Sequence, residues 1–237
     1  MRGIYSAGMG MLNSLQRLNS ISNNLANVNT NGYKKDTSLF KAILEKEFYS
    51  FPKNSQKGIG IGKTETAVVL DKVVPEMTQG KLVETNNNFD MAILGKGFFK
   101  VQSGKDIFYT RDGEFKLSAD GYLVDNNGNK ILDETNNPIR VQKNLEINEN
   151  GNINNTSNKI GIVELKNLSK KGTNYFIGTE VKDTISKIKQ GYVEKSNVDT
   201  LKEMVNMISA NREFEILQKA VQSQDSLNAK AIEITRT

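Results

Sequence analysis

The chain has 237 residues, of which 37% are hydrophobic and 7% aromatic, and it has no tryptophan. It contains neither cysteine nor histidine, which excludes disulfides, thiolate metal sites and the most common general base and metal ligand. The net charge of +5 fits a lysine-rich surface and by itself identifies no partner. There is no run of 18 apolar residues to predict a membrane-spanning helix, and we expect no cleavable signal peptide.

An amphipathic helix is predicted near the N-terminus, over residues 4–28. One stripe is apolar at spacings of seven, and another carries amide and hydroxyl groups. Before Thr30 the only charged residues are Arg2 and Arg17, so the polar stripe suits contact with protein better than contact with water. An ordinary core helix would show a similar pattern. Residues 29–32, which are Asn, Thr, Asn and Gly, predict where the helix ends. The polar stripe comprises Asn13, Arg17, Ser20, Asn24 and Asn27.

Residues 34–63 are expected to form a connector that includes a short helix around residues 39–44. The stretch GIGIGK at residues 58–63, followed by Thr64, resembles the end of a phosphate-binding loop. That motif also requires glycine at position 57, where the chain has Lys57, and it requires a helix afterwards. Residues 64–70 have the pattern of a strand instead. Nucleotide binding is therefore not expected.

The middle of the chain has the pattern of an antiparallel β domain. Strands are predicted at residues 64–70, 90–94, 98–101, 107–110, 145–147 and 159–165, and turn dipeptides such as Asn127-Gly128 lie between them. Turns recur every 8–12 residues, which is typical of a sandwich or a barrel-like domain. A polar link at residues 183–190 then leads to the last helix, predicted over residues 198–234 with Ser196 or Asn197 as its N-cap.

Two long terminal helices on either side of a β-rich segment define the predicted fold. We expect an α+β protein in which the N- and C-terminal helices pair as a coiled-coil-like unit around an inserted antiparallel β-rich domain. The predicted segments are an N-terminal assembly helix (1–33), a connector (34–63), a β-rich domain (64–190) and a C-terminal assembly helix (191–237).

Four motifs resemble those of the bacterial flagellar rod and hook protein family. They are SNNLANVNTNGYK at residues 22–34, GKGFFKV at 95–101, YTRDGEF at 109–115, and GYVEKSNV at 191–198 with EMVNMI and KAV after it. The motifs occur in the family's order over nearly the whole chain. Within the family, NREFE at residues 211–215 favours a proximal rod type, whereas GIGIGK at 58–63 and GKGFF at 95–99 are similar to distal types; of the two we favour the proximal type.

The resemblance implies a structural axial subunit of the flagellar basal-body rod, not an enzyme. Such a subunit polymerises through its terminal helices and transmits torque from motor to hook. The expected partners are further copies, other rod proteins, the hook, and membrane-ring and export-gate proteins, with bushing rings as a further possibility. No cofactor, no nucleic acid and no small-molecule substrate is expected. The implied location is the part of the basal body that spans the periplasm, reached through the flagellar type III export apparatus.

The expected assembly interface combines the apolar stripes of both helices with two asparagines. Apolar side chains should pack within and between subunits, and the asparagines should bond at the crowded tube wall. The interface comprises Ile4, Met11, Leu18, Ile21, Asn24, Leu25, Asn27 and Val28 of the first helix, and Leu201, Val205, Ile208, Phe214, Leu217 and Val221 of the last.

Catalytic and metal-binding patterns are weak. Residues 186–189 fit an S-x-x-K pattern, but the accompanying motifs are missing. The cluster at residues 125–129 suggests calcium, yet the sixth and twelfth positions are Lys130 and Asn136 instead of glycine and glutamate. Asp112 and Glu114 could pose as an acid–base pair, but no cleft is indicated. The alternative function is a secreted cell-wall (peptidoglycan) binding module or hydrolase that uses the β domain.

Overall fold

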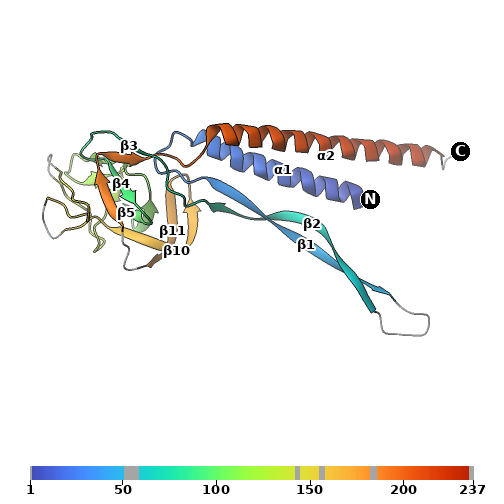
Figure 1. Ribbon diagram of the computed structural model, residues 1–237, viewed down its shortest axis with the longest axis horizontal. Coiled ribbons are helices and arrows are strands. Elements are labelled where there is room, and N and C mark those ends of the chain that lie inside the picture. Colours follow the sequence, from blue (N-terminus) through green and yellow to red (C-terminus); the bar gives the residue numbers. More distant parts are fainter. Residues whose placement is uncertain (1, 51–58, 142–144, 155–157, 182–185, 235–237) are drawn as a thin grey trace. The chain divides into compact units, whose positions relative to one another are not determined.

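The computed structural model describes residues 2–50, 59–141, 145–154, 158–181 and 186–234 (Figure 1). The chain begins and ends with a helix, and its middle is rich in β structure. The elements, in chain order, are α1 (Arg2–Ala26), β1 (Asp36–Ser50), β2 (Ile59–Pro75), β3 (Leu82–Glu84), β4 (Met91–Leu94), β5 (Phe98–Ser103), β6 (Asp106–Thr110), β7 (Lys116–Leu117), β8 (Leu123–Val124), β9 (Lys130–Ile131), β10 (Ile162–Lys171), β11 (Tyr175–Val181), β12 (Lys187–Gln190), β13 (Tyr192–Glu194) and α2 (Thr200–Ile234).

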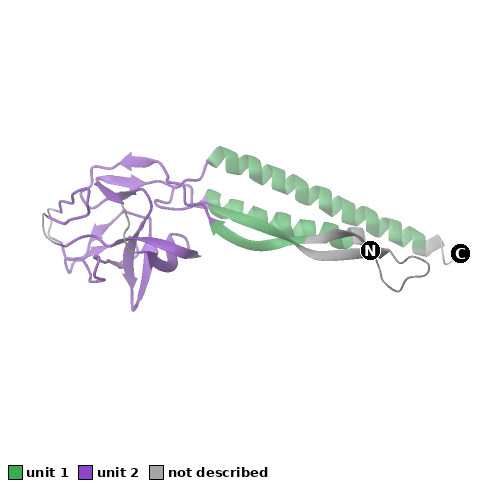
Figure 2. Ribbon diagram, turned by 60° about the horizontal axis from the view of Figure 1, so that its bottom comes forward, with its two compact units in different colours: residues 1–25, 36–74, 200–237 green, residues 26–35, 75–199 purple. Residues whose placement is uncertain are grey.

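The chain forms two compact units, each assembled from separate stretches of sequence (Figure 2). The helical unit contains residues 1–25, 36–74 and 200–237, and the β unit contains residues 26–35 and 75–199. The segment that follows α1 therefore belongs to the β unit and not to the helix from which it emerges. The division into four segments expected from the sequence stays a prediction.

The helical unit consists of the two terminal helices and a two-stranded hairpin. Helices α1 and α2 run antiparallel and side by side, so that the two chain ends lie at the same end of the pair (Figures 1 and 2). Both predicted helices are confirmed, and α2 has 35 residues. Strands β1 and β2 pair with each other. The short helix expected around residues 39–44 was wrong, because this stretch lies within strand β1. Leu39 and Phe40 are neighbours, and in a strand they point to opposite faces.

The N-cap expected at Ser196 or Asn197 was also wrong, because α2 begins only at Thr200. Both side chains instead organise the segment before the helix. The Ser196 hydroxyl accepts a hydrogen bond from the Val198 amide at 3.2 Å, and Asn197 Oδ1 accepts one from the Lys35 amide at 2.7 Å. Asn197 Nδ2 also donates to the carbonyl oxygen of Glu76 at 2.9 Å. These short polar side chains satisfy local backbone groups, which favours turns over helix.

The β unit is built on a seven-stranded sheet with the order β10-β11-β6-β5-β9-β8-β7. Strand β10 also pairs with β5, so strands β10, β11, β6 and β5 close into a ring of antiparallel pairs, as in a small barrel. A four-residue core made of Phe98, Tyr109, Val163 and Phe176 lies on one side of these strands. A larger apolar core, which includes Met91, Phe99, Phe115, Leu123 and Ile188, holds the rest of the unit together.

The link expected to be polar, residues 183–190, contains a strand in its described part. Strand β12 pairs with β4 and places Ile188 opposite Ile93. Ile188 is 2% exposed and belongs to the large core. One apolar residue among lysines can therefore anchor an edge strand, because alternate side chains of a strand point to opposite faces. Among the described residues, neither helix is long and apolar enough to cross a membrane.

We expect Ile188→Ala to lower the free energy of unfolding of the β unit by about 2–5 kcal/mol, because it leaves a cavity in the core. Urea unfolding of the full chain, followed by near-ultraviolet circular dichroism, measures the change. Ile177→Ala is the matched control: Ile177 lies on β11 and is 43% exposed, so its truncation should cost less than about 1 kcal/mol. Equal effects of the two substitutions would contradict the buried position of β12.

Candidate assembly interface

The polar stripe of α1 contacts other parts of the same chain, chiefly the β1–β2 hairpin. Asn24 is 1% exposed, and its Nδ2 donates to the Asp36 carbonyl oxygen at 2.9 Å and to Glu203 Oε2 at 3.3 Å. Its Oδ1 accepts a hydrogen bond from the Asp36 amide at 2.8 Å. A single amide thus joins α1, β1 and α2. Amides can do this because they donate and accept without the desolvation cost of an ion.

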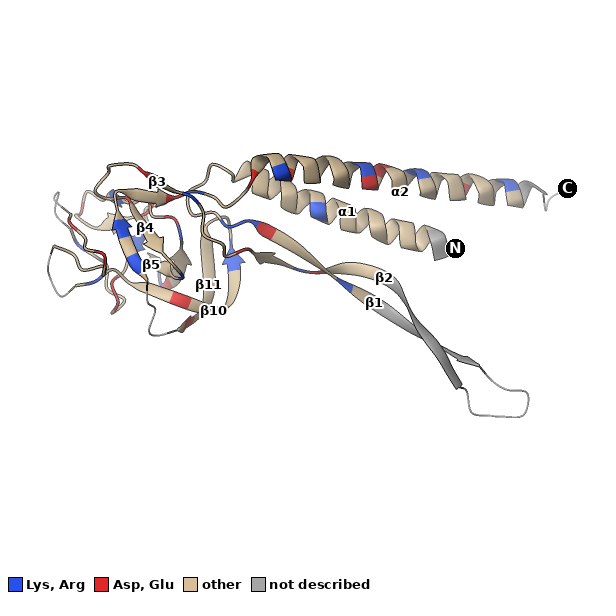
Figure 3. Ribbon diagram, viewed as in Figure 1, with Lys and Arg blue, Asp and Glu red and all other residues tan. Residues whose placement is uncertain are grey.

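Other members of the stripe follow the hairpin in the same way. Asn13 Nδ2 donates to the Val68 carbonyl oxygen of β2 at 2.7 Å, and the hydroxyls of Ser20 and Ser38 lie 2.7 Å apart. The Arg17 guanidinium lies 5.6 Å from the centre of the Phe40 ring, and it also donates to Glu213 Oε2 of α2 at 3.2 Å. Figure 3 shows how few charged residues α1 carries compared with α2. Apart from Arg17, whose side chain is 50% exposed, the stripe is uncharged, because most of it faces protein.

Small side chains let the two helices approach each other. Gly10 of α1 lies against Leu217 of α2, and a Cβ at position 10 would be 2.9 Å from Leu217 Cδ1. Ser14, Ile21 and Ala210 are also buried. Few side chains are thus buried for two helices of such length, since many of their apolar residues are exposed or only partly buried.

Several large apolar side chains of both helices are exposed in the part of the chain that the structure describes, and together they are called the uncovered apolar surface. The expected interface residues Leu201, Val205 and Ile208 are 77%, 62% and 53% exposed, so they do not pack on α1 within this chain. Ile21 and Asn24 are buried, and the other expected residues are partly buried, namely Ile4, Met11, Leu18, Leu25, Asn27, Val28, Phe214, Leu217 and Val221. Sequence reasoning missed further exposed apolar residues of this surface: Tyr5, Leu12, Leu15, Met204 and Ile216. The sequence did contain a pattern that could have indicated Tyr5 and Leu12, because residues seven apart lie on the same face of a helix.

The segment after α1, residues 26–35, forms a strap that is built into the β unit. Gly32 donates its amide to the Glu194 carbonyl oxygen at 2.7 Å, and its φ of 69° is in the left-handed region that glycine tolerates. A Cβ at position 32 would lie 2.2 Å from the amide nitrogen of Asp112. Tyr33 and Lys34, which follow, are each 1% exposed. The strap is therefore part of the core of the β unit and not a surface linker.

A buried carboxylate holds the strap in place. Lys34 Nζ donates to Glu194 Oε1 at 2.6 Å, and Arg111 Nη1 donates to Glu194 Oε2 at 3.1 Å. The Gly80 amide also donates to Oε1 at 2.8 Å. The side chains of Lys34, Arg111 and Glu194 are 1%, 5% and 1% exposed. Burial lowers the pKa of Lys34 and of Arg111, and the charge of Glu194 opposes both shifts.

Asn31 and Lys170 complete the attachment of the strap. Asn31 Nδ2 donates to Glu114 Oε2 at 2.8 Å, and its Oδ1 accepts a hydrogen bond from Lys195 Nζ at 2.9 Å. Lys170 Nζ lies 3.9 Å from the centre of the Tyr33 ring and donates to the Lys34 carbonyl oxygen at 3.1 Å. The sequence marked this stretch as the end of a helix and as part of a family motif, but did not show that its Lys34 and Asn31 have partners more than 80 residues away.

The patterns that suggested chemistry are explained by turns. Asp125 Oδ1 accepts hydrogen bonds from the amides of Asn127 and Asn129, and Asp125 Oδ2 accepts one from the Tyr175 hydroxyl at 2.5 Å. Both carboxylate oxygens are thus used to shape a turn and fasten it to β11. Within the described ranges, no three acidic, cysteine or histidine residues are placed to hold a metal ion.

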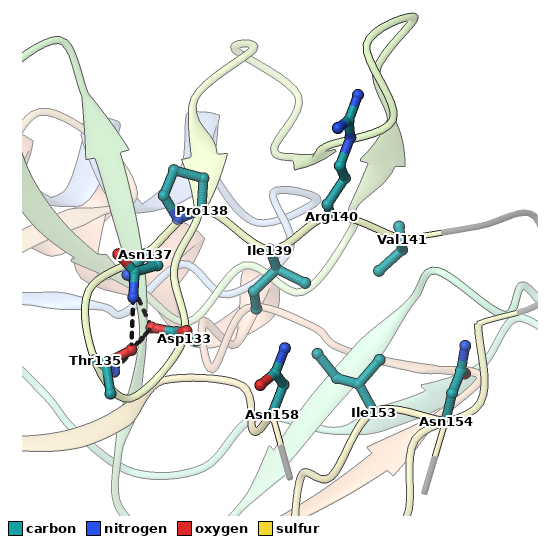
Figure 4. Close-up of a pocket in the computed structure, with 10 residues that line it drawn as sticks. All are labelled: Asp133, Thr135, Asn137, Pro138, Ile139, Arg140, Val141, Ile153, Asn154 and Asn158. Carbon is teal, nitrogen blue, oxygen red and sulfur yellow. Dashed lines mark hydrogen bonds between the residues drawn. The ribbon is translucent and has the colours of Figure 1, made fainter. Parts of the chain in front are cut away.

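A cleft of about 590 Å³ lies in the β unit beside the turn of residues 133–137 (Figure 4). Its wall includes Asp133, Thr135, Asn137, Arg140 and Ile153. Asp133 Oδ1 accepts hydrogen bonds from both Thr135 and Asn137, so the carboxylate shapes the turn (Figure 4). The described wall offers no pair of carboxylates in the roles of acid and base.

Comparison with known proteins places these features in one family. The flagella basal body rod protein model matches residues 4–34, the flagellar hook protein FlgE/F/G D1 domain model matches residues 92–155, and the flagellar basal body rod FlgEFG protein C-terminal model matches residues 189–234. These matches cover α1 with most of the strap, the middle of the β unit, and α2.

Whole-chain relatives agree. The chain is 34% identical to flagellar basal-body rod protein FlgG of Buchnera aphidicola subsp. Schizaphis graminum, over 90% of this chain and 92% of the relative. It is 32% identical to FlgG of Borreliella burgdorferi, over 96% of each chain, and 28% identical to flagellar basal-body rod protein FlgF of Caulobacter vibrioides, over 95% of each.

The chain thus combines a pair of terminal helices that carry exposed apolar side chains with an inserted β unit, an arrangement that suits a subunit of a larger assembly. The chain belongs to the flagellar basal-body rod protein family, whose members are structural proteins and not known as enzymes. Its similarity to FlgG proteins favours the distal rod type, and not the proximal type that residues 211–215 suggested.

We expect Glu194→Gln to destabilise the β unit by about 3–5 kcal/mol, because Lys34 and Arg111 then remain buried without their counter-charge. Urea unfolding of the full chain at pH 7 measures the loss. Glu149→Gln is the control: Glu149 pairs with Lys187 at 2.8 Å on the surface, and its replacement should leave the unfolding midpoint unchanged. A Glu194→Gln protein as stable as the control would show that the strap does not depend on this carboxylate.

Asp112, whose backbone lies against Gly32 of the strap, provides a pH-dependent test of the β unit at this position. Burial, with additions from Glu114 and Asp125, raises the pKa of Asp112 to about 6. Between the unfolded pKa of about 3.9 and pH 6 the folded protein binds more protons, so stability falls as the pH rises through this window. We expect Asp112→Asn to stabilise the β unit by about 1–2 kcal/mol at pH 7.5, and to have little effect at pH 3.5.

Urea unfolding of the wild-type and variant chains at both pH values measures this difference. The control is Asp120→Asn, the same substitution at an exposed turn, measured at both pH values beside Asp112→Asn. A gain from Asp112→Asn that does not depend on pH would contradict the raised pKa.

Proposed function

We propose that this protein is a structural subunit of the flagellar basal-body rod, of the FlgG type, which polymerises through its two terminal helices. The observation that carries the proposal is the uncovered apolar surface shared by α1 and α2, which includes Leu12, Leu201, Val205 and Ile208. Large exposed apolar surfaces mark sites of protein association. Further copies of the same helices would cover this surface.

The helices are expected to pair as a coiled-coil-like unit in the polymer. Their antiparallel contacts at Asn24–Glu203 and Arg17–Glu213 support this geometry, as does the close approach of Gly10 and Leu217. The buried set in the single chain is small, so much of the ordering of the helices would come from neighbouring subunits. Torque from motor to hook would then pass through many shared helix contacts.

The partners and location follow from family membership. The relatives are named basal-body rod proteins, which supports a place in the basal body. Contacts with other rod proteins, the hook, membrane-ring or export-gate proteins and bushing rings are part of the proposal. So are a position in the periplasm and delivery through the type III export apparatus. The cell-wall binding or hydrolase alternative is not supported by the relatives.

Charge placed on the uncovered surface should block assembly without unfolding the chain. We expect Val205→Glu and Ile208→Glu to weaken subunit association by more than about a hundredfold, because each buries an unpaired carboxylate in the interface. The measurement is swimming in soft agar by a deletion strain complemented with each variant, together with electron microscopy of its basal bodies.

Gln218→Glu is the matched control, since it adds the same charge at an exposed position of α2. It should leave swimming close to the wild-type level. Circular dichroism of the purified variants should show unchanged folded monomers. A Val205→Glu strain that swims and builds complete rods would refute assembly through this surface.

A further inference from the structure

A lysine, an asparagine and a glutamate converge within the β unit, and none of the three belongs to the strap. Lys100 Nζ lies 2.9 Å from Asn136 Oδ1, 3.0 Å from Glu180 Oε1 and 3.1 Å from Glu180 Oε2. The Lys100 side chain is 4% exposed. A primary amide and a carboxylate are thus both within hydrogen-bond distance of one amine, whose side chain has almost no access to water. The proposed function uses none of the three.

The fold fixes each of these groups separately. Lys100 is the cross-strand partner of Tyr109, on the side of β5 and β6 that carries the small aromatic core. The Tyr109 hydroxyl donates to Glu180 Oε1 at 2.9 Å, and burial together with Glu180 raises the pKa of Tyr109, so the phenol stays a donor. Glu180 is thereby oriented toward Lys100 from strand β11.

Asn136 is held by the turn that Asp133 organises. Asp133 Oδ1 accepts hydrogen bonds from the amides of Thr135 and Asn137, both at 2.8 Å (Figure 4). Between them Asn136 takes a left-handed conformation with a φ of 65°, which asparagine tolerates better than most residues. In this conformation the side-chain amide of Asn136 accepts the hydrogen bond from Lys100. Asn136 itself is exposed at the protein surface.

We propose that Lys100 and Asn136 form an intramolecular isopeptide bond, with Glu180 as the proton carrier. Holding the amine against the amide replaces an encounter in solution by a local reaction, which can contribute several orders of magnitude in rate. A lysine amine becomes nucleophilic when a neighbouring base takes its proton. Glu180 is within hydrogen-bond distance of that proton.

The reaction balances without an oxidant or a second substrate. Glu180 takes a proton from the Lys100 ammonium, and the freed Nζ attacks Cγ of Asn136. The Nζ–Cγ bond forms, and Glu180 delivers this first proton to Nδ2. Nζ must lose a second proton to become an amide nitrogen, and Glu180 takes that proton and passes it to the same departing nitrogen as the Cγ–Nδ2 bond breaks. The leaving group departs as ammonium toward solvent from the exposed side of Asn136, so the protein loses the atoms of one ammonia and one positive charge. The product is a secondary amide that joins β5 to the turn after β9.

Intact mass of the purified, folded full chain tests the proposal. The mass should lie about 17 Da, one ammonia molecule, below the value for the sequence. After denaturation and trypsin digestion, the peptides that contain Lys100 and Asn136 should appear as one branched species, because the acylated Lys100 is not cleaved. Lys100→Arg should restore the full mass.

Two variants separate the chemistry from the fold. Glu180→Gln keeps the size of the side chain and removes the proton carrier, so it should show the full mass while its circular dichroism matches wild type. Glu149→Gln, at the surface, should retain the cross-link. An unchanged mass for the folded wild-type chain after prolonged incubation would overturn the proposal. Cross-linking of the Glu180→Gln chain at the wild-type rate would overturn the role of Glu180.

Discussion

The β unit depends on one carboxylate, that of Glu194, which is removed from water and must be neutralised where it lies. Lys34 arrives from the strap and Arg111 from the end of β6, and the Gly80 amide adds a third donor. These groups come from three distant parts of the chain, so the carboxylate has its full set of donors only when all three have been brought together. A buried charge that lacks its partners costs several kcal/mol, and this penalty removes partly folded alternatives. The strap is thereby an integral part of the β unit.

In the helical unit, amides replace charges for a related reason. The polar side of α1 is covered by β1 and β2, where a charged residue would need a buried counter-charge. Asn24 and Asn13 instead donate to backbone carbonyl oxygens of the hairpin. The apolar side shows the opposite arrangement, because side chains such as Leu12 and Val205 face outward. The covered side of α1 is thus polar and its exposed side carries apolar residues, whereas a water-soluble amphipathic helix exposes its polar side.

The sequence predicted the two helices, strands β4, β5, β6 and β10 of the β unit, and the family, because these depend on local periodicity, turn dipeptides and motifs; the strand expected at residues 145–147 is only an isolated bridge at Ile147. It did not predict that residues 39–44 form a strand, since Leu39, Phe40 and neighbouring apolar residues fit a helical turn equally well and only their pairing with β2 decides. It could not identify the partners of Lys34 or Asn24, because they are far away in sequence. It expected Leu201, Val205 and Ile208 to pack within and between subunits; within this chain they are exposed, and their packing between subunits stays a prediction.

The helical unit can form only after nearly the whole chain is present. Asn24 and Glu203 are 179 residues apart, and Arg17 and Glu213 are 196 apart, whereas the strap and residues 75–199 complete the β unit earlier. In a chain that emerges N-terminus first, α1 is present before the β unit can fold, and its contacts with α2 form only after the last residues have emerged. The order of emergence therefore places the exposed apolar side chains of α2, which the proposed assembly would use, in the last part of the chain to appear, after the residues that complete the β unit.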